Sequence, residues 1–332
     1  MKIALLSLAL VLFSSYSRAL PEAEVSEGFS TEVLSWYQSH MRAGEFRSVK
    51  NLVIRYFSFE QAEAQCVLVF SPGQGEPSLK YAELFFDLKD LGCNLFSIDH
   101  RSQGYSQRLL SDSQKTHIEH YSDYITDFTF LVNSIVQPKK YQHSLLLAHS
   151  MGGAIASGYL RKFPKTFSKV ILSAPMMEIN GGQYNQIEAL LFADLLMLLW
   201  RGEDYAPGQS GYDPNTTFEQ GLTNSEARFR VTTDLQNAIP QIQSGGVTVR
   251  WVAESLYFTL GLRQTKFLFQ VPTVIFQAGL DTKVLPDGQN QVCGLSPQMC
   301  RIEKFPQAKH GFLIEKDSIR DRVLEQIKSA LH

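Results

Sequence analysis

The chain has 332 residues, of which 44% are hydrophobic and 19% are charged. That share of apolar residues is enough for a large buried core, and it excludes an intrinsically disordered protein. The 31 Lys and Arg residues nearly balance the 33 Asp and Glu residues, which gives a formal net charge of −2. Because there is no basic excess, we expect no nucleic-acid partner.

The N-terminus has the layout of a secretory signal peptide. Lys2 supplies a positive charge, residues 4–13 form an apolar run, and Ser17 and Ala19 place small residues at the −3 and −1 positions of a cleavage site. The apolar run is too short to span a bilayer of about 30 Å. We therefore expect residues 1–19 to be removed and the protein to be exported, to the periplasm or out of the cell. An uncut membrane anchor is the alternative.

The four cysteines allow three full pairings. Cys293 and Cys300 flank a short loop that contains Gly and Pro, so they are the candidate disulfide pair. Cys66 and Cys93 each begin a predicted strand, where they could also be ordinary core thiols. No group of His and Cys residues has the spacing of a zinc site, and we expect neither a metal nor an organic cofactor.

Short apolar runs alternate with longer amphipathic segments along most of the chain. The runs predict β-strands at residues 66–70, 94–98, 144–148, 169–173, 272–276 and 302–305. The segments between them predict helices at residues 81–91, 121–135, 151–163 and 317–331. This order is typical of an α/β fold with a mostly parallel sheet flanked by helices on both faces.

The alternation stops between about residues 177 and 267, where we predict a mainly helical insertion, or cap. The core domain would then consist of residues 20–176 and 268–332. Within the insertion, the stretch from Leu190 to Trp200 carries one charge, on Asp194. This stretch could line an acyl pocket or contact a lipid surface, and a buried cap helix is the plainer alternative.

The strongest single motif surrounds Ser150. An apolar strand leads into Ala148-His149-Ser150-Met151-Gly152, and a helix of small residues follows. This is the G-x-S-x-G pattern of a nucleophile on a tight strand-to-helix turn, with Ala148 in place of the first Gly. The pattern predicts that the Ser150 hydroxyl is presented at the carboxyl edge of the sheet.

A serine nucleophile needs a base and a carboxylate that orients the base. Only His310 and the terminal His332 follow Ser150 in the chain, and the usual order for this architecture is Ser, acid, His. We therefore predict His310 as the base and Asp281, just beyond a predicted strand, as the acid. The backbone N–H groups of Met151 and Gln74 are the predicted oxyanion donors.

A second polar group, Asp99-His100, also ends a predicted strand. It could be read as an alternative catalytic pair, but His100 precedes Ser150, which is the wrong order for the base. We expect it to form a polar network that supports a neighbouring loop.

Four blocks of sequence, residues 72–88, 98–112, 145–156 and the tail at 274–284 and 309–317, carry a resemblance to a known family. The chain resembles the α/β-hydrolase superfamily, and more narrowly the bacterial lysophospholipases of the monoacylglycerol-lipase-like branch, which have an S33-type hydrolase domain. The resemblance implies Ser150, Asp281 and His310 as the catalytic residues and the N–H groups of Gln74 and Met151 as the oxyanion donors. It also implies that the insertion is a lid.

The resulting hypothesis is an exported serine esterase that cleaves fatty-acyl esters of lysophospholipids or monoacylglycerols through an acyl-enzyme. Its partner is a small lipid ester, and the cap is a candidate for peripheral contact with a membrane. Two alternatives stay open: a serine aminopeptidase or amidase on the same fold, and a non-catalytic lipid-binding protein. The sequence does not predict the oligomeric state.

Overall fold

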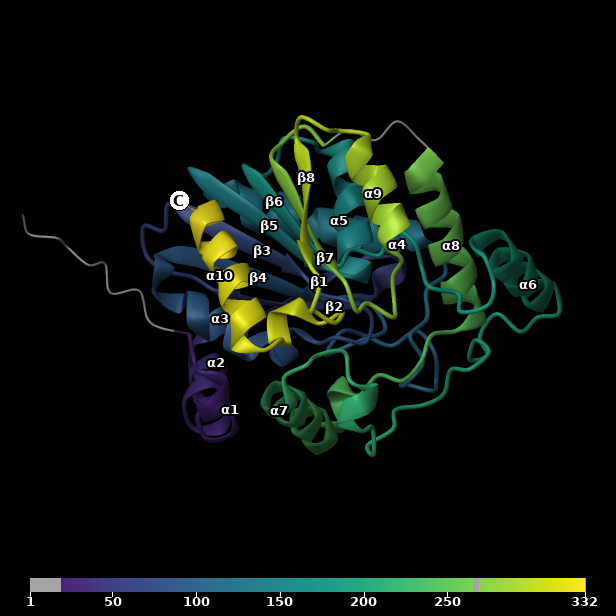
Figure 1. The fold of residues 1–332 in the computed structure, drawn as a ribbon, viewed down its shortest axis with the longest axis horizontal. Helices are drawn as coiled ribbons and strands as arrows, with labels where there is room; N and C mark the ends of the chain where they lie inside the picture. Colours follow the sequence, from purple (N-terminus) through teal and green to yellow (C-terminus); the bar gives the residue numbers. More distant parts are fainter. Residues whose placement is uncertain (1–18, 265–268, 332) are drawn as a thin grey trace, which may run out of the picture.

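The computed structural model describes residues 19–264 and 269–331, so residues 1–18 of the predicted signal peptide lie outside the described residues. Its centre is one sheet of eight strands in the order β1-β2-β4-β3-β5-β6-β7-β8 (Figure 1). The strands are β1 Arg42–Arg47, β2 Val53–Phe59, β3 Cys66–Ser71, β4 Cys93–Asp99, β5 His143–His149, β6 Lys169–Ser173, β7 Thr273–Ala278 and β8 Cys300–Phe305.

The sheet is parallel from β4 to β8 and antiparallel at one edge. β4-β3, β3-β5, β5-β6, β6-β7 and β7-β8 pair in parallel, whereas β1-β2 and β2-β4 pair antiparallel. Every residue of β3 and β4 is buried, as expected of strands covered on both faces. The α/β prediction is confirmed. The edge hairpin β1-β2 was not predicted.

Helices cover both faces of the sheet (Figure 1). On one face, α3 (Ala82–Leu88) lies beside α10 (Asp317–Leu331), and an ion pair between Asp87 and Arg320 joins them. On the other face lie α4 (Tyr121–Phe130), α5 (Met151–Lys162) and α9 (Pro286–Gly294). Two further helices, α1 (Glu22–Gly28) and α2 (Leu34–His40), precede the sheet, and α2 packs against α3.

In its described residues, the segment between β6 and β7 contains three α-helices. They are α6 (Gln186–Leu198), α7 (Glu226–Ala238) and α8 (Val249–Gln264). α6 packs on α8 through a small apolar cluster that includes Leu190, Ala193 and Leu256. α7 lies apart from that pair and packs against α1 (Figure 1).

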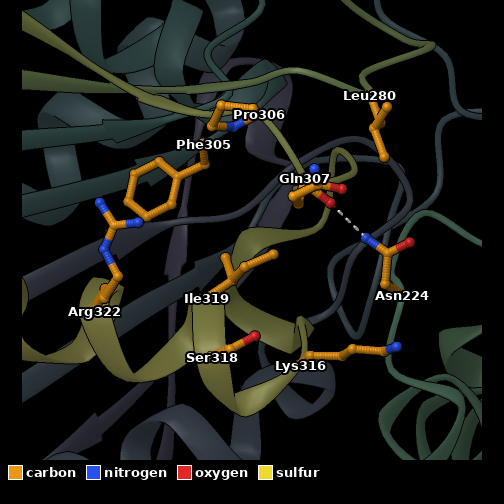
Figure 2. A pocket seen from close by; sticks show the side chains of 9 residues that line it. All are labelled: Asn224, Leu280, Phe305, Pro306, Gln307, Lys316, Ser318, Ile319 and Arg322. Atoms are coloured by element: carbon orange, nitrogen blue, oxygen red, sulfur yellow. Dashed lines mark hydrogen bonds between the residues drawn. The ribbon is translucent and has the colours of Figure 1, made fainter.

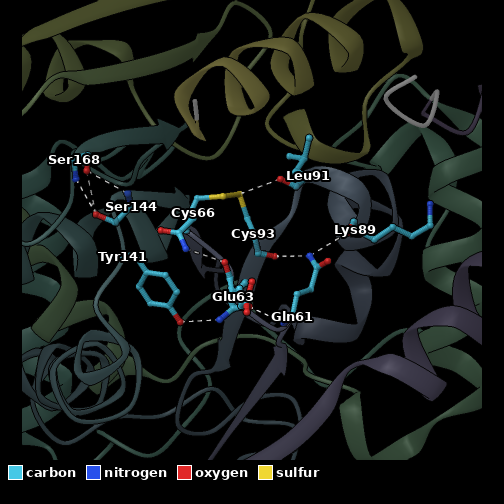
Figure 3. The surroundings of a disulfide bond; sticks show 11 residues. Gln61, Glu63, Cys66, Lys89, Leu91, Cys93, Tyr141, Ser144 and Ser168 are labelled. Atoms are coloured by element: carbon cyan, nitrogen blue, oxygen red, sulfur yellow. Dashed lines mark hydrogen bonds between the residues drawn. A yellow bond between two sulfur atoms is a disulfide. The ribbon is translucent and has the colours of Figure 1, made fainter. Parts of the chain in front are cut away.

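All four cysteines form disulfides. Cys293–Cys300, the predicted pair, ties α9 to β8. Cys66 and Cys93, which could have been core thiols, are paired register partners at the starts of β3 and β4. Figure 3 shows the side-chain amide of Gln61 donating to the carbonyl oxygen of Cys93 at 3.0 Å next to that bond.

Candidate active site

Ser150 occupies a strained turn between β5 and α5. Its φ is 52°, in the left-handed region that side chains rarely adopt. The two glycines after Ser150 permit this turn, because neither position has room for a side chain. A Cβ on Gly152 would lie 2.1 Å from the carbonyl oxygen of Ser71, and one on Gly153 would lie 2.5 Å from Pro175 Cβ. Ala148, which replaces the usual first Gly, fits as a fully buried residue at the end of β5.

The structure brings Ser150, His310 and Asp281 together in one hydrogen-bonded chain. His310 Nε2 lies 2.9 Å from Ser150 Oγ, and His310 Nδ1 lies 2.7 Å from Asp281 Oδ2. The second oxygen of Asp281 accepts from the backbone N–H groups of Lys283 at 2.7 Å and Val284 at 3.1 Å. The side chains of His310 and Asp281 are almost fully buried, so water does not compete for their contact.

The electrostatics of Asp281 favour its ionised form. Burial alone would raise the pKa of this carboxyl, but the hydrogen bond and charge of His310 and the two backbone N–H groups outweigh burial and hold the pKa below its usual value. An ionised carboxylate at this place fixes the tautomer of His310 with the proton on Nδ1, which leaves Nε2 free to accept a proton from Ser150.

Both predicted oxyanion donors lie beside Ser150. Met151 is the first residue of α5, so its N–H has no acceptor within the helix. Gln74 belongs to the loop after β3, and this loop runs so close that a Cβ on Gly73 would lie 3.2 Å from Ser150 Cβ. The N–H of Gly73 donates to Glu76 and that of Gly75 donates to Gln103, so the Gln74 N–H lies between two anchored neighbours.

Glu76, which the sequence analysis did not single out, fixes the conformation of this loop. Its buried carboxylate accepts from the N–H of Gly73 at 2.8 Å, from Tyr81 Oη at 2.6 Å and from Lys80 Nζ at 2.7 Å. Burial raises the pKa of Glu76, but Lys80, His149 and these hydrogen bonds reverse the effect and lower the pKa to about 2. The signal in the sequence was the Gly-Gln-Gly-Glu run of the loop.

The ring of His149 packs against the ring of His310. Its ring centre lies 4.9 Å from that of His310, and its Nδ1 lies 3.0 Å from the carbonyl oxygen of Ser173. Burial lowers the pKa of His149 to about 4, so this imidazole is neutral at pH 7. A neutral ring at this place puts no second positive charge beside His310.

Asp99 and His100 form the supporting network that the sequence suggested. His100 is fully buried, and its Nε2 lies 3.0 Å from Ser71 Oγ at the end of β3. Burial and the charge of Arg101 lower the pKa of His100 to about 3. The Asp99 carboxylate accepts from the backbone N–H groups of Ser78 at 2.6 Å and Tyr105 at 2.7 Å. These contacts support the loops on either side of the site.

An apolar cavity of about 330 Å³ lies in the insertion, lined by residues of α6 and α8 and the segments next to them. One wall of the cavity is Val247, close in sequence to Gly245, whose carbonyl oxygen accepts from the Gln74 side chain at 3.4 Å. Gln74 Nε2 also donates to Thr116 Oγ1 at 2.8 Å, and Thr116 forms a β-bridge with Val247. The cavity and the Gln74 loop are therefore neighbours.

The stretch from Leu190 to Trp200 belongs partly to this cavity and partly to the surface. Phe192, Ala193 and Leu196 line the cavity. On the outer side, Leu191 is 64% exposed, Leu198 77% and Trp200 96%. A plain buried cap helix is therefore wrong for this stretch, which presents an apolar face to solvent.

A second cavity, of about 360 Å³, lies outside the site (Figure 2). It is lined by residues on both sides of the β8–α10 connection, including Leu280, Gln307 and Lys316, and neither Ser150 nor His310 reaches it. Within the described ranges, no cluster of His, Cys, Asp and Glu residues is arranged to hold a metal ion.

Comparisons with known proteins identify the family of this chain. A family model described as serine aminopeptidase, S33, matches residues 62–317. Lysophospholipase L2 of Escherichia coli strain K12 is 31% identical over 295 residues, which cover 85% of each chain. Monoglyceride lipase of Rattus norvegicus is 23% identical over 266 residues, or 80% of this chain and 82% of the lipase.

The solved structures show the same fold. A soluble variant of monoglyceride lipase from Saccharomyces cerevisiae, in complex with a substrate analog, matches with a TM-score of 0.68 at 19% identity and covers 88% of this chain and 95% of that one. A carboxyl esterase from Bacillus coagulans gives a TM-score of 0.66 at 14% identity and covers 87% and 97%. The chain belongs to the serine aminopeptidase S33 family of α/β-hydrolases, with lysophospholipases and monoglyceride lipases among its relatives.

Proposed function

We propose that this carboxylic ester hydrolase releases a fatty acid from a lysophospholipid, with a monoacylglycerol as the second substrate class. The observation that carries the proposal is the hydrogen-bonded chain from Ser150 Oγ through His310 to Asp281. The apolar cavity of the insertion, which neighbours the Gln74 loop, supports a substrate with an acyl chain. The 31% identity to a lysophospholipase over most of both chains supports the lysophospholipid as the first candidate, and the 23% identity to a monoglyceride lipase supports the glyceride as the second.

In the proposed mechanism, Ser150 Oγ attacks the ester carbonyl carbon while His310 Nε2 takes the hydroxyl proton. The carbonyl oxygen becomes an oxyanion, which accepts from the N–H groups of Met151 and Gln74. His310 then gives its proton to the leaving glycerol oxygen, and an acyl-Ser150 intermediate remains. Water, activated by the same imidazole, hydrolyses this intermediate and restores the Ser150 hydroxyl. Asp281 stays ionised and stabilises the imidazolium.

The apolar cavity suits the acyl chain of such a substrate. It takes its walls from leucine, valine and aromatic side chains of α6 and α8, and burial of apolar surface contributes about 25 cal/mol for each Å² removed from water. A charged peptide would gain nothing from these walls. This chemistry favours a lipid ester over the peptide substrate of an aminopeptidase.

We place the protein in an exported, oxidising environment, in the periplasm or outside the cell. The two disulfides support this location, because such bonds persist where thiols are not kept reduced. None of the described helices is both long and apolar enough to cross a bilayer. The exposed side chains of Leu191, Leu198 and Trp200 supply an apolar face that can rest on a membrane surface.

The test is fatty-acid release from lysophosphatidylcholine by the purified protein and by the Ser150→Ala variant. We expect release by the first and at least a thousandfold loss in the second, with Ser157→Ala on the same helix as the matched control. Monooleoylglycerol and leucine p-nitroanilide, assayed in parallel, distinguish a glyceride lipase and an aminopeptidase. Equal rates for the protein and Ser150→Ala would refute the role of Ser150, and turnover of the anilide alone would favour the peptidase.

A further inference from the structure

A buried network of charged side chains lies between α3, α7 and α10, away from the active site. Arg228 of α7 is 1% exposed, and its guanidinium contacts Glu83 of α3 at 3.0 Å and Asp317 of α10 at 2.8 Å. Arg320 of α10, also 1% exposed, contacts Asp87 of α3 at 2.6 Å. The network therefore joins the insertion to two helices of the body.

Leu20 enters this network through its backbone. Its N–H donates to Asp87 Oδ1 at 3.3 Å, and its carbonyl oxygen accepts from Arg228 Nη2 at 3.0 Å. Its side chain is 8% exposed and packs on α1, where a Cβ added at Gly28 would lie 3.1 Å from Leu20 Cδ1. Leu20 is thus held at its nitrogen, its oxygen and its side chain.

The network carries more negative than positive charge. Its carboxylates are Glu83, Asp87 and Asp317, and its cations are Arg228 and Arg320, so each carboxylate contacts an arginine but the five groups together carry a net charge of −1. The neighbouring Asp321 adds to the imbalance: burial and the charge of Asp317 raise the pKa of this exposed carboxyl. Without Asp321, one further positive charge beside Asp87 would bring the net charge of the three carboxylates and two guanidiniums to zero.

We propose that the Ala19–Leu20 peptide bond is a processing site and that the α-ammonium group of Leu20, once released, is the missing cation bound by Asp87. Ser17 and Ala19 supply the small residues that an export signal peptidase requires before the scissile bond. Hydrolysis breaks the C–N bond of Ala19–Leu20 and adds one water molecule. The carbonyl carbon takes the oxygen and ends as the Ala19 carboxylate, and the nitrogen ends as the ammonium of Leu20.

The nitrogen that carries the new charge already lies within hydrogen-bond distance of a buried carboxylate. Cleavage therefore replaces a neutral amide donor with a charge-assisted one at the same position, and such bonds are roughly twice as strong. The processed chain gains a contact that the precursor lacks. The inference rests on the export part of the proposed function and is independent of the esterase reaction.

The first measurement is the N-terminus of the full-length gene product, recovered from the envelope or medium of a Gram-negative host and read by intact mass and Edman sequencing. We expect Leu20 as the first residue. An uncut chain, or one that begins at any other residue, would overturn the proposal. Lysophosphatidylcholine turnover is recorded separately, so a failure of processing and a failure of the esterase assignment are distinguishable.

The second measurement compares the melting temperatures of two disulfide-bonded chains. One begins at Leu20, and the other carries a Gly-Ser dipeptide and Ala19 before it, which keeps the Leu20 nitrogen as an amide. We expect the first chain to melt about 3 °C higher, and this difference to disappear when both carry Asp87→Asn. The exposed Asp90→Asn is the matched control and should preserve the difference. Equal melting of the two chains, or a difference that survives Asp87→Asn, would overturn the proposal.

Because Asp87 also pairs with Arg320, the Asp87→Asn chains can fail to fold, so a third measurement uses no variant. The chain that begins at Leu20 is treated at neutral pH with an aldehyde reagent selective for α-amines. One sample is folded, and the other is unfolded in urea. We expect labelling of the folded chain to be at least tenfold slower. Equal labelling rates would show an amine free in solvent and would overturn the proposal.

Discussion

The variant Glu76→Gln tests the role of the buried carboxylate behind the oxyanion loop. The pKa of Glu76 is lowered from 4.5 to about 2. A shift of this size corresponds to about 3 kcal/mol of stability at pH 7, at 1.36 kcal/mol for each pKa unit. A glutamine keeps the shape of the side chain but loses the charge, so Lys80 is left without its partner and the N–H of Gly73 without a carboxylate.

The sign of the pH dependence follows from the lowered pKa. A carboxyl whose pKa is lower in the folded chain than in the unfolded chain stabilises the fold fully when the pH is above the unfolded pKa of 4.5. This stabilisation is lost as the pH falls toward the folded pKa of about 2. We therefore expect the stability gap between the protein and Glu76→Gln to shrink from about 3 kcal/mol at pH 7 to about 1 kcal/mol at pH 3. Urea unfolding at both pH values measures the gap.

The same variant should lower kcat more than it raises KM, because the loop positions an oxyanion donor rather than the ground-state substrate. Glu60→Gln, which removes an exposed carboxylate paired with Lys139, is the control and should change neither quantity. A stability gap of the same size at pH 7 and pH 3, or an unchanged kcat, would refute the reasoning.

Three further predictions concern the site and the insertion. Asp281→Asn should lower kcat about 10³- to 10⁴-fold, because His310 loses the carboxylate that fixes its tautomer; a loss below tenfold in initial-rate assays would contradict this. Gly152→Ala should cost about 3 kcal/mol or prevent folding, since its Cβ would lie 2.1 Å from a carbonyl oxygen; Gly294→Ala, whose Cβ meets no atom within 4 Å, is the control in thermal melting. Replacing Leu198 and Trp200 together by Asp should weaken vesicle binding without changing turnover of a soluble ester, and unchanged flotation with vesicles would exclude this face from membrane contact.

Most of the parallel strands could be predicted because each contains a short apolar run, although β8, with the sequence CRIEKF, is interrupted by charged residues. β3, with the sequence CVLVF followed by Ser71, is buried throughout and leaves a plain signal. The hairpin β1-β2 gave no such sequence signal, since β1 reads RAGEFR and buries only Phe46. It forms because β2 finds a partner in β4, a tertiary contact that no local pattern records.

The residues of the candidate site also divide into those that the sequence predicted and those that it did not. Chain order and the strand ends were enough to select Ser150, Asp281 and His310, because the fold permits few alternatives. Glu76 and His149 were not singled out. Glu76 reaches back to Gly73 within its own loop, and the Gly-Gln-Gly-Glu run alone does not reveal that the carboxylate turns inward. His149 lies against the ring of His310, a contact between distant parts of the chain that spacing in the sequence does not record.

The two ends of the insertion differ in what they allow to move. α7 is fastened to the body through Arg228, a buried guanidinium that could not leave without stranding the buried carboxylate of Glu83 on α3. α6 and α8 hold each other mainly by apolar contacts, with one hydrogen bond from Tyr257 Oη to Asp194, and no buried ion pair joins these two helices among the described residues. If the substrate is the proposed lipid ester, we therefore expect it to enter past α6, where the exposed apolar face lies, while α7 stays fixed to the body.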